Sequence, residues 1–381
     1  MTINENTVIK ASGARPEIPG AALETKLVQA GSRTDTLYGS INTPIYLSTT
    51  FSHPEYGAST GYDYTRTANP TRLALEEVFA DIEGGAGAVA TASGMSAVQL
   101  AVELAVVGKT IVTSRDLYGG TFRWFDVLEQ KGVYKFAYAD SEDEFVGLID
   151  EDTTLVFIES PTNPLMNQVS IERISARAHE VGAVVVVDNT FFTPYYQKPL
   201  ELGADVVIHS ATKYLSGHND VLGGAAIAKT PELFDKLTFA LNTTGPVLGP
   251  FESFLVLRGL KTFTLRMDRH TENAERVVSW LARNGKVLDV FYAGKTGMIS
   301  FKIGDAAKVP TFLNALNLVT YAESLGGVET LITYPSEQTH ADIPEADRIA
   351  YGLTNDLLRM SIGLENSEDI LVDLENAFNA I

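Results

Sequence analysis

The regular alternation of short apolar runs with amphipathic stretches, from residue 62 to residue 249, most limits what this chain can fold into. Alternation of this kind builds a mostly parallel sheet covered by helices. We therefore predict an α/β domain over residues 62–250. The apolar runs predict strands over residues 86–92, 110–113, 154–158, 184–187 and 205–208, with helices in most of the intervals.

The segments on either side of this region follow different patterns. Residues 1–61 carry short apolar pieces broken by Pro44 and Pro54, which is typical of an extended arm rather than a domain. Residues 251–381 favour a smaller C-terminal α+β domain. Its predicted elements are a helix over 252–283 interrupted at Gly259, a strand over 297–303, and helices over 309–316 and 367–381.

Composition excludes several classes of function. The 381 residues include 48 acidic and 29 basic side chains, a net charge of −19, so we expect neither nucleic acid nor a membrane as the main partner. No cysteine is present, which excludes disulfides and a cysteine nucleophile, and the six histidines show no paired ligand motif, so no metal is expected. The first twenty residues lack the apolar stretch of a secretory signal, and we expect a cytoplasmic protein.

Four polar segments follow predicted strands, at the edge where open parallel sheets bind ligands. They are Ser93-Gly94-Met95, Asn163, Asp188 and the run from Ser210 to Lys213. The first precedes a helix, whose N–H groups suit a phosphate; the alternative is a simple turn capped by Ser93.

Asp188 and Lys213 each allow two interpretations. Asp188 follows four valines, where a carboxylate needs either a cationic partner or hydrogen bonds to loop amides. Lys213 follows Ser210 and Thr212, and burial would make its amine nucleophilic toward carbonyls while the two hydroxyls bind a phosphate. The alternative for Lys213 is a surface lysine.

Taken together, these residues resemble the Cys/Met-metabolism family of pyridoxal-phosphate (PLP) enzymes, a group of fold type I. This family includes cystathionine γ-synthase, cystathionine β- and γ-lyases and methionine γ-lyase. The resemblance spans nearly the whole chain. It rests on YDYTRTANPTR (62–72), ATASGMSA (90–97), DLYGGTFR (116–123), ESPTNP (159–164), VVVVDNTF (184–191), HSATKYLSGHNDV (209–221), RGLKT (258–262), AESLGG (322–327) and LLRMSIGLE (357–365).

The resemblance implies PLP as the cofactor and the PLP-dependent transferase fold type I. Lys213 would hold PLP through a Schiff base and shuttle protons, and Asp188 would pair with the pyridinium nitrogen. Tyr118 would stack on the ring as a second catalytic residue. The other cofactor ligands implied are Gly94, Met95, Ser210 and Thr212, together with Tyr64 and Arg66, which would reach the phosphate of a neighbouring subunit.

The resemblance also implies a small amino-acid substrate and a homo-oligomer, a tetramer built as a dimer of dimers. Asn163 would lie near the ring hydroxyl, and Ser324 with Arg359 would bind the substrate carboxylate. Glu323 resembles the γ-synthase, γ-lyase and Gram-positive β-lyase members and suits a distal ammonium. The chain departs from the family in a short segment, residues 293–296, where members usually carry a longer loop, and it lacks the thiol of methionine γ-lyase.

We therefore predict a PLP-dependent carbon–sulfur lyase of trans-sulfuration. The leading prediction is γ-elimination of cystathionine to cysteine, 2-oxobutanoate and ammonia. Two alternatives use the same residues: β-elimination to homocysteine, pyruvate and ammonia, and γ-synthesis from cysteine and an activated homoserine ester. An alternative of another class is an inactive homologue that carries PLP.

Overall fold

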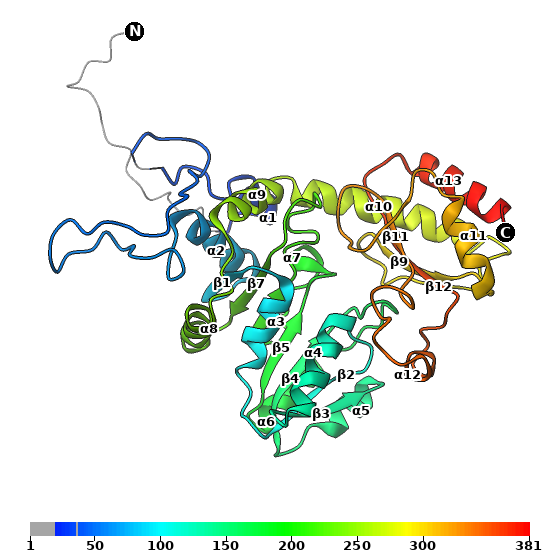
Figure 1. Cartoon of the computed structure of the whole chain (residues 1–381), viewed down its shortest axis with the longest axis horizontal. Helices are drawn as coiled ribbons and strands as arrows, with labels where there is room; N and C mark the ends of the chain where they lie inside the picture. Colours follow the sequence, from blue (N-terminus) through cyan, green and yellow to red (C-terminus); the bar gives the residue numbers. More distant parts are fainter. Residues whose placement is uncertain (1–19, 36) are drawn as a thin grey trace, which may run out of the picture.

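The computed structural model describes residues 20–35 and 37–381, and Figure 1 shows a larger and a smaller sheet region linked by the long helix α10. The larger sheet has the strand order β1-β7-β6-β5-β4-β2-β3. Strands β2 to β6 run parallel to one another, whereas β7 is antiparallel to both β1 and β6. Its strands are β1 (Gly87–Thr91), β2 (Thr110–Ser114), β3 (Lys135–Ala139), β4 (Thr153–Glu159), β5 (Val184–Asp188), β6 (Val206–His209) and β7 (Gly224–Ala228).

Helices cover both faces of this sheet because successive strand residues point to opposite sides. Val185 and Val187 join one buried cluster with side chains of α2, α5 and α6, while Val186 joins another with side chains of α3, α4 and α8. The helices of this region are α2 (Pro70–Glu83), α3 (Gly94–Val102), α4 (Gly119–Gln130), α5 (Glu142–Leu148), α6 (Ile171–Glu180), α7 (Thr193–Tyr196) and α8 (Pro231–Thr244). The predicted α/β architecture is confirmed.

The smaller region is built on a second sheet, of order β10-β11-β12-β9-β8. Side chains of α10, α11 and α13 form its buried cluster with the central strands. Its strands are β8 (Asp289–Phe291), β9 (Met298–Lys302), β10 (Thr320–Tyr321), β11 (Leu331–Thr333) and β12 (Leu357–Ser361). The helices after residue 249 are α9 (Pro250–Leu260), α10 (Phe263–Leu281), the 3₁₀ turn η2 (Ala306–Lys308), α11 (Val309–Asn314), α12 (Glu345–Ala350) and α13 (Ser367–Asn379).

Helix α9 begins at the predicted boundary near residue 250, but it packs on α2 of the larger region. A division of the chain into domains at this point therefore stays a prediction. The predicted interruption near Gly259 is present, since α9 ends at Leu260 and α10 starts at Phe263. A Cβ at Gly259 would lie 2.2 Å from the Ser216 carbonyl oxygen, so only glycine allows α9 to approach the loop that follows β6.

Strands β3 and β7 were not predicted from the sequence. Strand β7 is the run GAAIA, whose small residues give no strand signal, yet it lies buried between β1 and β6. A Cβ at Gly224 would come within 2.3 Å of the Ser93 carbonyl oxygen, so close packing rather than propensity fixes this strand. Strand β3 lies at the edge of the sheet, and most of its residues are only partly buried.

The described residues before α2 include a short helix, α1 (Leu23–Val28), and a bridge between Thr50 and Tyr64. Figure 1 shows part of this segment as a long loop that projects from the body of the molecule. The predicted arm and the absence of a secretory signal concern residues 1–19 as well, which lie outside the described residues. No helix within the described residues is both long and apolar enough to cross a membrane.

Candidate active site

The carboxyl ends of the parallel strands, together with residues of the smaller region, enclose a cavity of about 180 Å³. It lies where ligands bind in open α/β sheets. Eleven of the predicted site residues line it: Gly94, Met95, Tyr118, Asn163, Asp188, Ser210, Thr212, Lys213, Glu323, Ser324 and Arg359.

The first turn of α3 forms one wall of this cavity. Ser93 caps the helix, because its side chain accepts a hydrogen bond from the backbone N–H of Ser96 at 3.1 Å. A Cβ at Gly94 would lie 2.7 Å from the Cβ of Ser210, so glycine is needed for the close approach of α3 to the loop after β6. The N–H groups of a first helical turn have no partner inside the helix, and here they face a loop rich in hydroxyls.

Two acidic side chains end adjacent strands of the sheet. Glu159 on β4 and Asp188 on β5 are partners in the strand register. Asp188 Oδ1 accepts a hydrogen bond from the Thr190 N–H at 2.9 Å, the loop-amide contact expected of its alternative interpretation, while Asp188 also lines the cavity. Burial raises the pKa of Asp188, and burial together with the charge of Asp188 raises the pKa of Glu159 well above its usual value.

Lys213 follows β6, and its side chain is directed at the smaller region. Its Nζ donates a hydrogen bond to Ser324 Oγ at 3.0 Å. Burial, reinforced by the charge of Arg359 and opposed by that of Glu323, lowers the pKa of Lys213 to about 8. Lys213 is partly buried and lines the cavity, so the interpretation as an ordinary surface lysine is wrong. With this pKa, about a tenth of the amine is neutral at pH 7.

Arg359 projects from the middle of β12 and is only 2% exposed. Its Nη1 donates to Asn163 Oδ1 at 2.8 Å, and its Nη2 donates at 3.1 Å to both the Ser324 carbonyl oxygen and Thr333 Oγ1. All three acceptors are neutral, and the buried Nε has no partner among the described residues. Burial lowers the pKa of Arg359 to about 10, and a buried cation held only by neutral groups suits an anionic ligand.

Tyr118 stands at the N-terminal end of α4, lines the cavity and is 40% exposed as a residue. Its backbone N–H donates to Glu159 Oε2 at 3.0 Å. A Cβ at Gly120 would lie 2.6 Å from the Tyr118 ring, so the glycine leaves room for the side chain. Glu159 thus fixes the start of α4 and with it the position of the tyrosine.

Tyr64 and Arg66 do not line the cavity. They lie on an exposed turn before α2, where the Arg66 guanidinium stacks over the Tyr64 ring at 5.3 Å and its Nε donates to Asn242 Oδ1 at 3.3 Å. The structure therefore does not bring these two residues to Lys213 of their own chain. Their predicted contact with the phosphate of a neighbouring subunit stays a prediction.

The polar residues that line the cavity and were not predicted as site residues include Thr121, Glu159, Thr190 and Thr339. Glu159 ends a buried strand as Asp188 does, and this position is the signal that could have identified it. Thr190 Oγ1 accepts the Ser210 N–H at 2.8 Å. Across the described part of the chain, no group of three or more His, Asp or Glu side chains is placed to hold a metal ion.

Known proteins resemble this chain over almost its full length. A profile of the family described as Cys/Met metabolism PLP-dependent enzyme matches residues 24–379. The cystathionine gamma-synthase/O-acetylhomoserine (thiol)-lyase of Bacillus subtilis (strain 168) is 48% identical over 93% of this chain and 96% of its own length. The cystathionine gamma-lyase of the same organism is 41% identical over 94% of this chain and 99% of its own length.

A solved structure agrees with these relatives. Cystathionine gamma-lyase from Lactobacillus plantarum, complexed with L-serine, has a TM-score of 0.92 and 37% identity, covering 95% of this chain and 99% of that one. The family profile, the two relatives and this structure all cover both sheet regions. The chain therefore belongs to the Cys/Met metabolism family of PLP-dependent enzymes, and PLP is its cofactor.

Proposed function

We propose that this enzyme makes or breaks the Cγ–S bond of cystathionine in the Lys213 cavity. The observation that carries the proposal is the convergence of three groups on Ser324. Lys213 Nζ donates to the Ser324 hydroxyl at 3.0 Å, Arg359 Nη2 donates to its carbonyl at 3.1 Å, and Glu323 precedes it in the chain and lines the same cavity. A base, a carboxylate-binding cation and an acidic group therefore adjoin one another.

The residues present fit PLP. The close approach of Gly94 to Ser210, with a capped helix N-terminus on one side and hydroxyls on the other, forms a cradle suited to the phosphate. Gly94, Met95, Ser210 and Thr212 would hold the phosphate, Asp188 the ring nitrogen, Asn163 the region of the ring hydroxyl, and Tyr118 the ring face. When bound, PLP supplies an electron sink that stabilises negative charge at Cα of the substrate.

Lys213 would move the protons. Its pKa of about 8 leaves part of the amine neutral near pH 7, so the amine can accept the proton from Cα. Chemistry at Cγ requires a second proton to leave Cβ, and the flexible four-carbon side chain of the same lysine can serve both positions. Ser324 Oγ accepts a hydrogen bond from the free amine and would orient it for these transfers.

Arg359 would orient the substrate by its α-carboxylate. The hydrogen bond to Asn163 Oδ1 fixes the plane of the guanidinium, and the unpartnered Nε leaves a donor for a further acceptor. Orienting the carboxylate positions Cα toward Lys213, because both side chains contact Ser324.

Glu323 would select a substrate with a second ammonium. The side chain is exposed at the cavity, and its charge acts on Lys213. At a separation of about 4 Å and an intermediate dielectric constant, an ion pair between Glu323 and a substrate ammonium contributes a few kcal/mol before desolvation. This contribution is enough to favour cystathionine, or an incoming cysteine, over methionine.

The direction of the reaction is proposed from the relatives. The relative named a γ-synthase matches at 48% and the relative named a γ-lyase at 41%, so we propose γ-synthesis from cysteine and an activated homoserine ester as the main reaction. The γ-elimination predicted from the sequence is the second candidate. It uses the same proton transfers at Cα and Cβ.

A paired assay tests the proposal. The purified holoenzyme is given cystathionine alone, and separately cysteine with an O-acylhomoserine, while cystathionine, 2-oxobutanoate and pyruvate are quantified. We expect cystathionine to form from the ester pair faster than 2-oxobutanoate forms from cystathionine. Faster 2-oxobutanoate would make the enzyme a γ-lyase, predominant pyruvate would make it a β-lyase, and no product in either arm would contradict the proposal.

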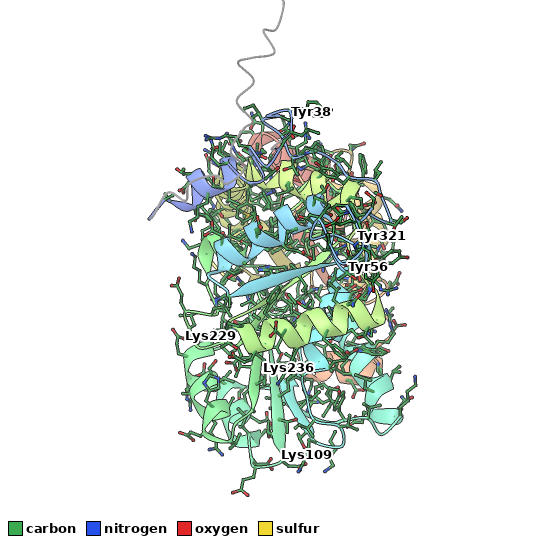
Figure 2. All side chains as sticks on the ribbon, turned by 90° about the vertical axis from the view of Figure 1, so that its left-hand side faces the viewer. Tyr38, Tyr56, Lys109, Lys229, Lys236 and Tyr321 are labelled. Atoms are coloured by element: carbon green, nitrogen blue, oxygen red, sulfur yellow. The ribbon has the colours of Figure 1, made fainter. Side chains whose placement is uncertain are left out.

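We also propose that the enzyme works as a homo-oligomer, a tetramer of two dimers, in which Tyr64 and Arg66 reach the phosphate site of the neighbouring chain. Apolar side chains on the segment before α2 support this proposal, because Leu37, Tyr38 and Tyr56 are at least 71% exposed. Figure 2 shows Tyr38 and Tyr56 at the surface. A second copy of the chain would cover them.

A further inference from the structure

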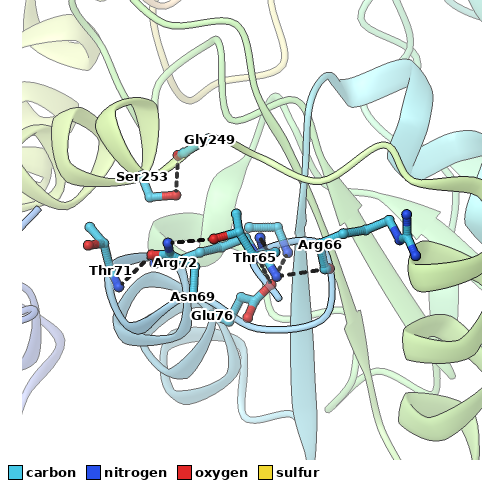
Figure 3. A network of polar contacts seen from close by, with 9 residues as sticks. Thr65, Arg66, Asn69, Thr71, Arg72, Glu76, Gly249 and Ser253 are labelled. Atoms are coloured by element: carbon cyan, nitrogen blue, oxygen red, sulfur yellow. Dashed lines mark hydrogen bonds and ion pairs between the residues drawn. The ribbon is translucent and has the colours of Figure 1, made fainter. Parts of the chain in front are cut away.

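Arg72 is a charged side chain buried behind the exposed turn of Tyr64 and Arg66. It lies in the first turn of α2, and its side chain is 1% exposed. Its Nη1 donates to the Thr65 carbonyl oxygen at 2.7 Å and its Nη2 to the Arg66 carbonyl oxygen at 3.2 Å. Figure 3 shows these contacts and shows the Arg66 side chain directed away from Arg72. The rigid fork of one guanidinium thus fixes two successive carbonyl groups of the turn.

Glu76 connects the same guanidinium to the sheet. Its Oε1 accepts a hydrogen bond from Arg72 Nε at 3.3 Å and another from the Ala90 N–H of β1 at 3.0 Å. The Glu76 side chain is 14% exposed, so water screens this ion pair little. Three residues beyond Ala90, the chain reaches Ser93, the N-cap of α3, where the proposed phosphate site begins.

One buried ion pair therefore joins the two segments to which the proposed function gives phosphate contacts in two different subunits. In the proposed function, Gly94 and Met95 at the start of α3 contact the phosphate bound by their own chain. The Tyr64–Arg66 turn contacts the phosphate bound by the neighbouring chain. Neither Arg72 nor Glu76 lines the cavity. Any effect of the pair on the cofactor must therefore pass through these segments.

We propose that Arg72 and Glu76 are positioning residues that hold the Tyr64–Arg66 turn for the partner's cofactor phosphate and thereby set PLP affinity. This inference rests on the proposed function. A purely structural role for the pair would change stability and leave PLP affinity independent of Arg66.

A double-mutant cycle separates the two roles. Arg72→Lys keeps the charge that pairs with Glu76 but removes the fork that donates to both carbonyl groups. PLP dissociation constants are measured by absorbance titration of the apoenzyme for Arg72→Lys, Arg66→Ala and the double variant, with thermal unfolding recorded for each. Arg348→Lys is the matched control, because Arg348 is also buried and donates to a backbone carbonyl, that of Ile343, away from this turn.

We expect Arg72→Lys to weaken PLP binding about tenfold in the wild-type background and less than about twofold in the Arg66→Ala background, while lowering the unfolding temperature equally in both. Arg348→Lys should lower the unfolding temperature without changing PLP affinity. An equal loss of PLP affinity in both backgrounds, or no loss in either, would overturn the inference.

Two further results keep the test decisive. If Arg72→Lys does not fold, Glu76→Gln replaces it in the same cycle, since it retains the shape of the side chain and removes only the charge. If Arg66→Ala binds PLP as tightly as the wild type, the inference fails although the proposed reaction stands. If the wild type turns over neither substrate pair yet shows the dependence on Arg66, the inference stands and the proposed reaction fails.

Discussion

Lys213 and Arg66 are two cationic side chains with opposite surroundings. The lysine lies in a cavity where its own chain supplies Ser324, Arg359 and Glu323. The arginine lies on an exposed turn, and its contacts are a neutral amide and an aromatic ring. One chain thus gathers polar groups around Lys213 and directs the Arg66 side chain away from this cavity. Under the proposed function, a single chain supplies the surroundings of Lys213, and a second copy of the chain supplies the Arg66 contact.

The largest effect should come from removing the Lys213 amine from the cavity. Lys213→Ala should lower the turnover of either substrate pair by about 10⁴-fold, because the variant loses the amine that would both hold PLP and take the Cα proton. Lys229→Ala, at an exposed lysine labelled in Figure 2, is the control and should retain full activity. Turnover of Lys213→Ala within tenfold of the wild type would show that the cavity is not the reaction centre.

The second largest effect should come from changing Arg359, the cation proposed to orient the substrate in the same cavity. Arg359→Lys keeps the charge and loses the fork, so kcat/KM should fall about 100-fold, mainly through a higher KM. Steady-state kinetics give the split between kcat and KM, and thermal unfolding checks that the variant is folded. An unchanged KM would mean that the substrate carboxylate binds elsewhere.

A substitution in the exposed Tyr64–Arg66 turn should have a smaller effect, and an intact neighbouring subunit should restore the lost activity. Arg66→Ala should weaken PLP binding on the order of tenfold, since one charge-assisted contact to the phosphate is lost. At limiting PLP, we expect Arg66→Ala and Lys213→Ala chains to have little activity alone. After dissociation and random reassociation, about a quarter of the sites should be intact. The exposed Arg269→Ala is the control for surface charge.

Activity that does not return, although hetero-oligomers form, would show that each site is complete within one chain. In that case the contrast between Lys213 and Arg66 would reflect surface exposure alone.

The smallest expected effect is the dependence of PLP capture on pH, which tests the surroundings of Lys213. Lys213 can attack an aldehyde only as the neutral amine, and with a pKa of about 8 its neutral fraction falls about fivefold from pH 8 to pH 7. The rate at which the apoenzyme captures PLP, followed by visible absorbance, should fall by a similar factor. Glu323→Gln should shift this profile to lower pH, because the charge of Glu323 raises the lysine pKa. A profile that stays flat from pH 9 to pH 7 would contradict the lowered pKa.

Much of the larger region could be predicted because its signals are local. Asn69 caps α2 through hydrogen bonds from the Thr71 and Arg72 N–H groups, and Gly84 ends the helix in the left-handed conformation, as their positions in the sequence indicate. Asp188 and Lys213 were identifiable because polar residues directly follow buried strands. These features depend on neighbours within a few residues.

The remaining features depend on contacts between distant segments. The approach of Arg359 to Asn163 joins the two sheet regions, and no spacing in the sequence indicates it. The burial of Arg72 is equally hidden, because an arginine in a first helical turn ordinarily faces water. Strand β7 is fixed by its close approach to β1 and Ser93 rather than by its composition.

The assignment of the cofactor to Lys213 is the central claim, and one measurement tests it most directly. The holoenzyme is reduced with borohydride, which makes the link between PLP and a lysine permanent, then digested and analysed by peptide mass spectrometry. The pyridoxyl group should be found on the peptide that contains Lys213 and nowhere else. A stoichiometric adduct on any other lysine, with Lys213 unmodified, would contradict the account of the enclosed cavity.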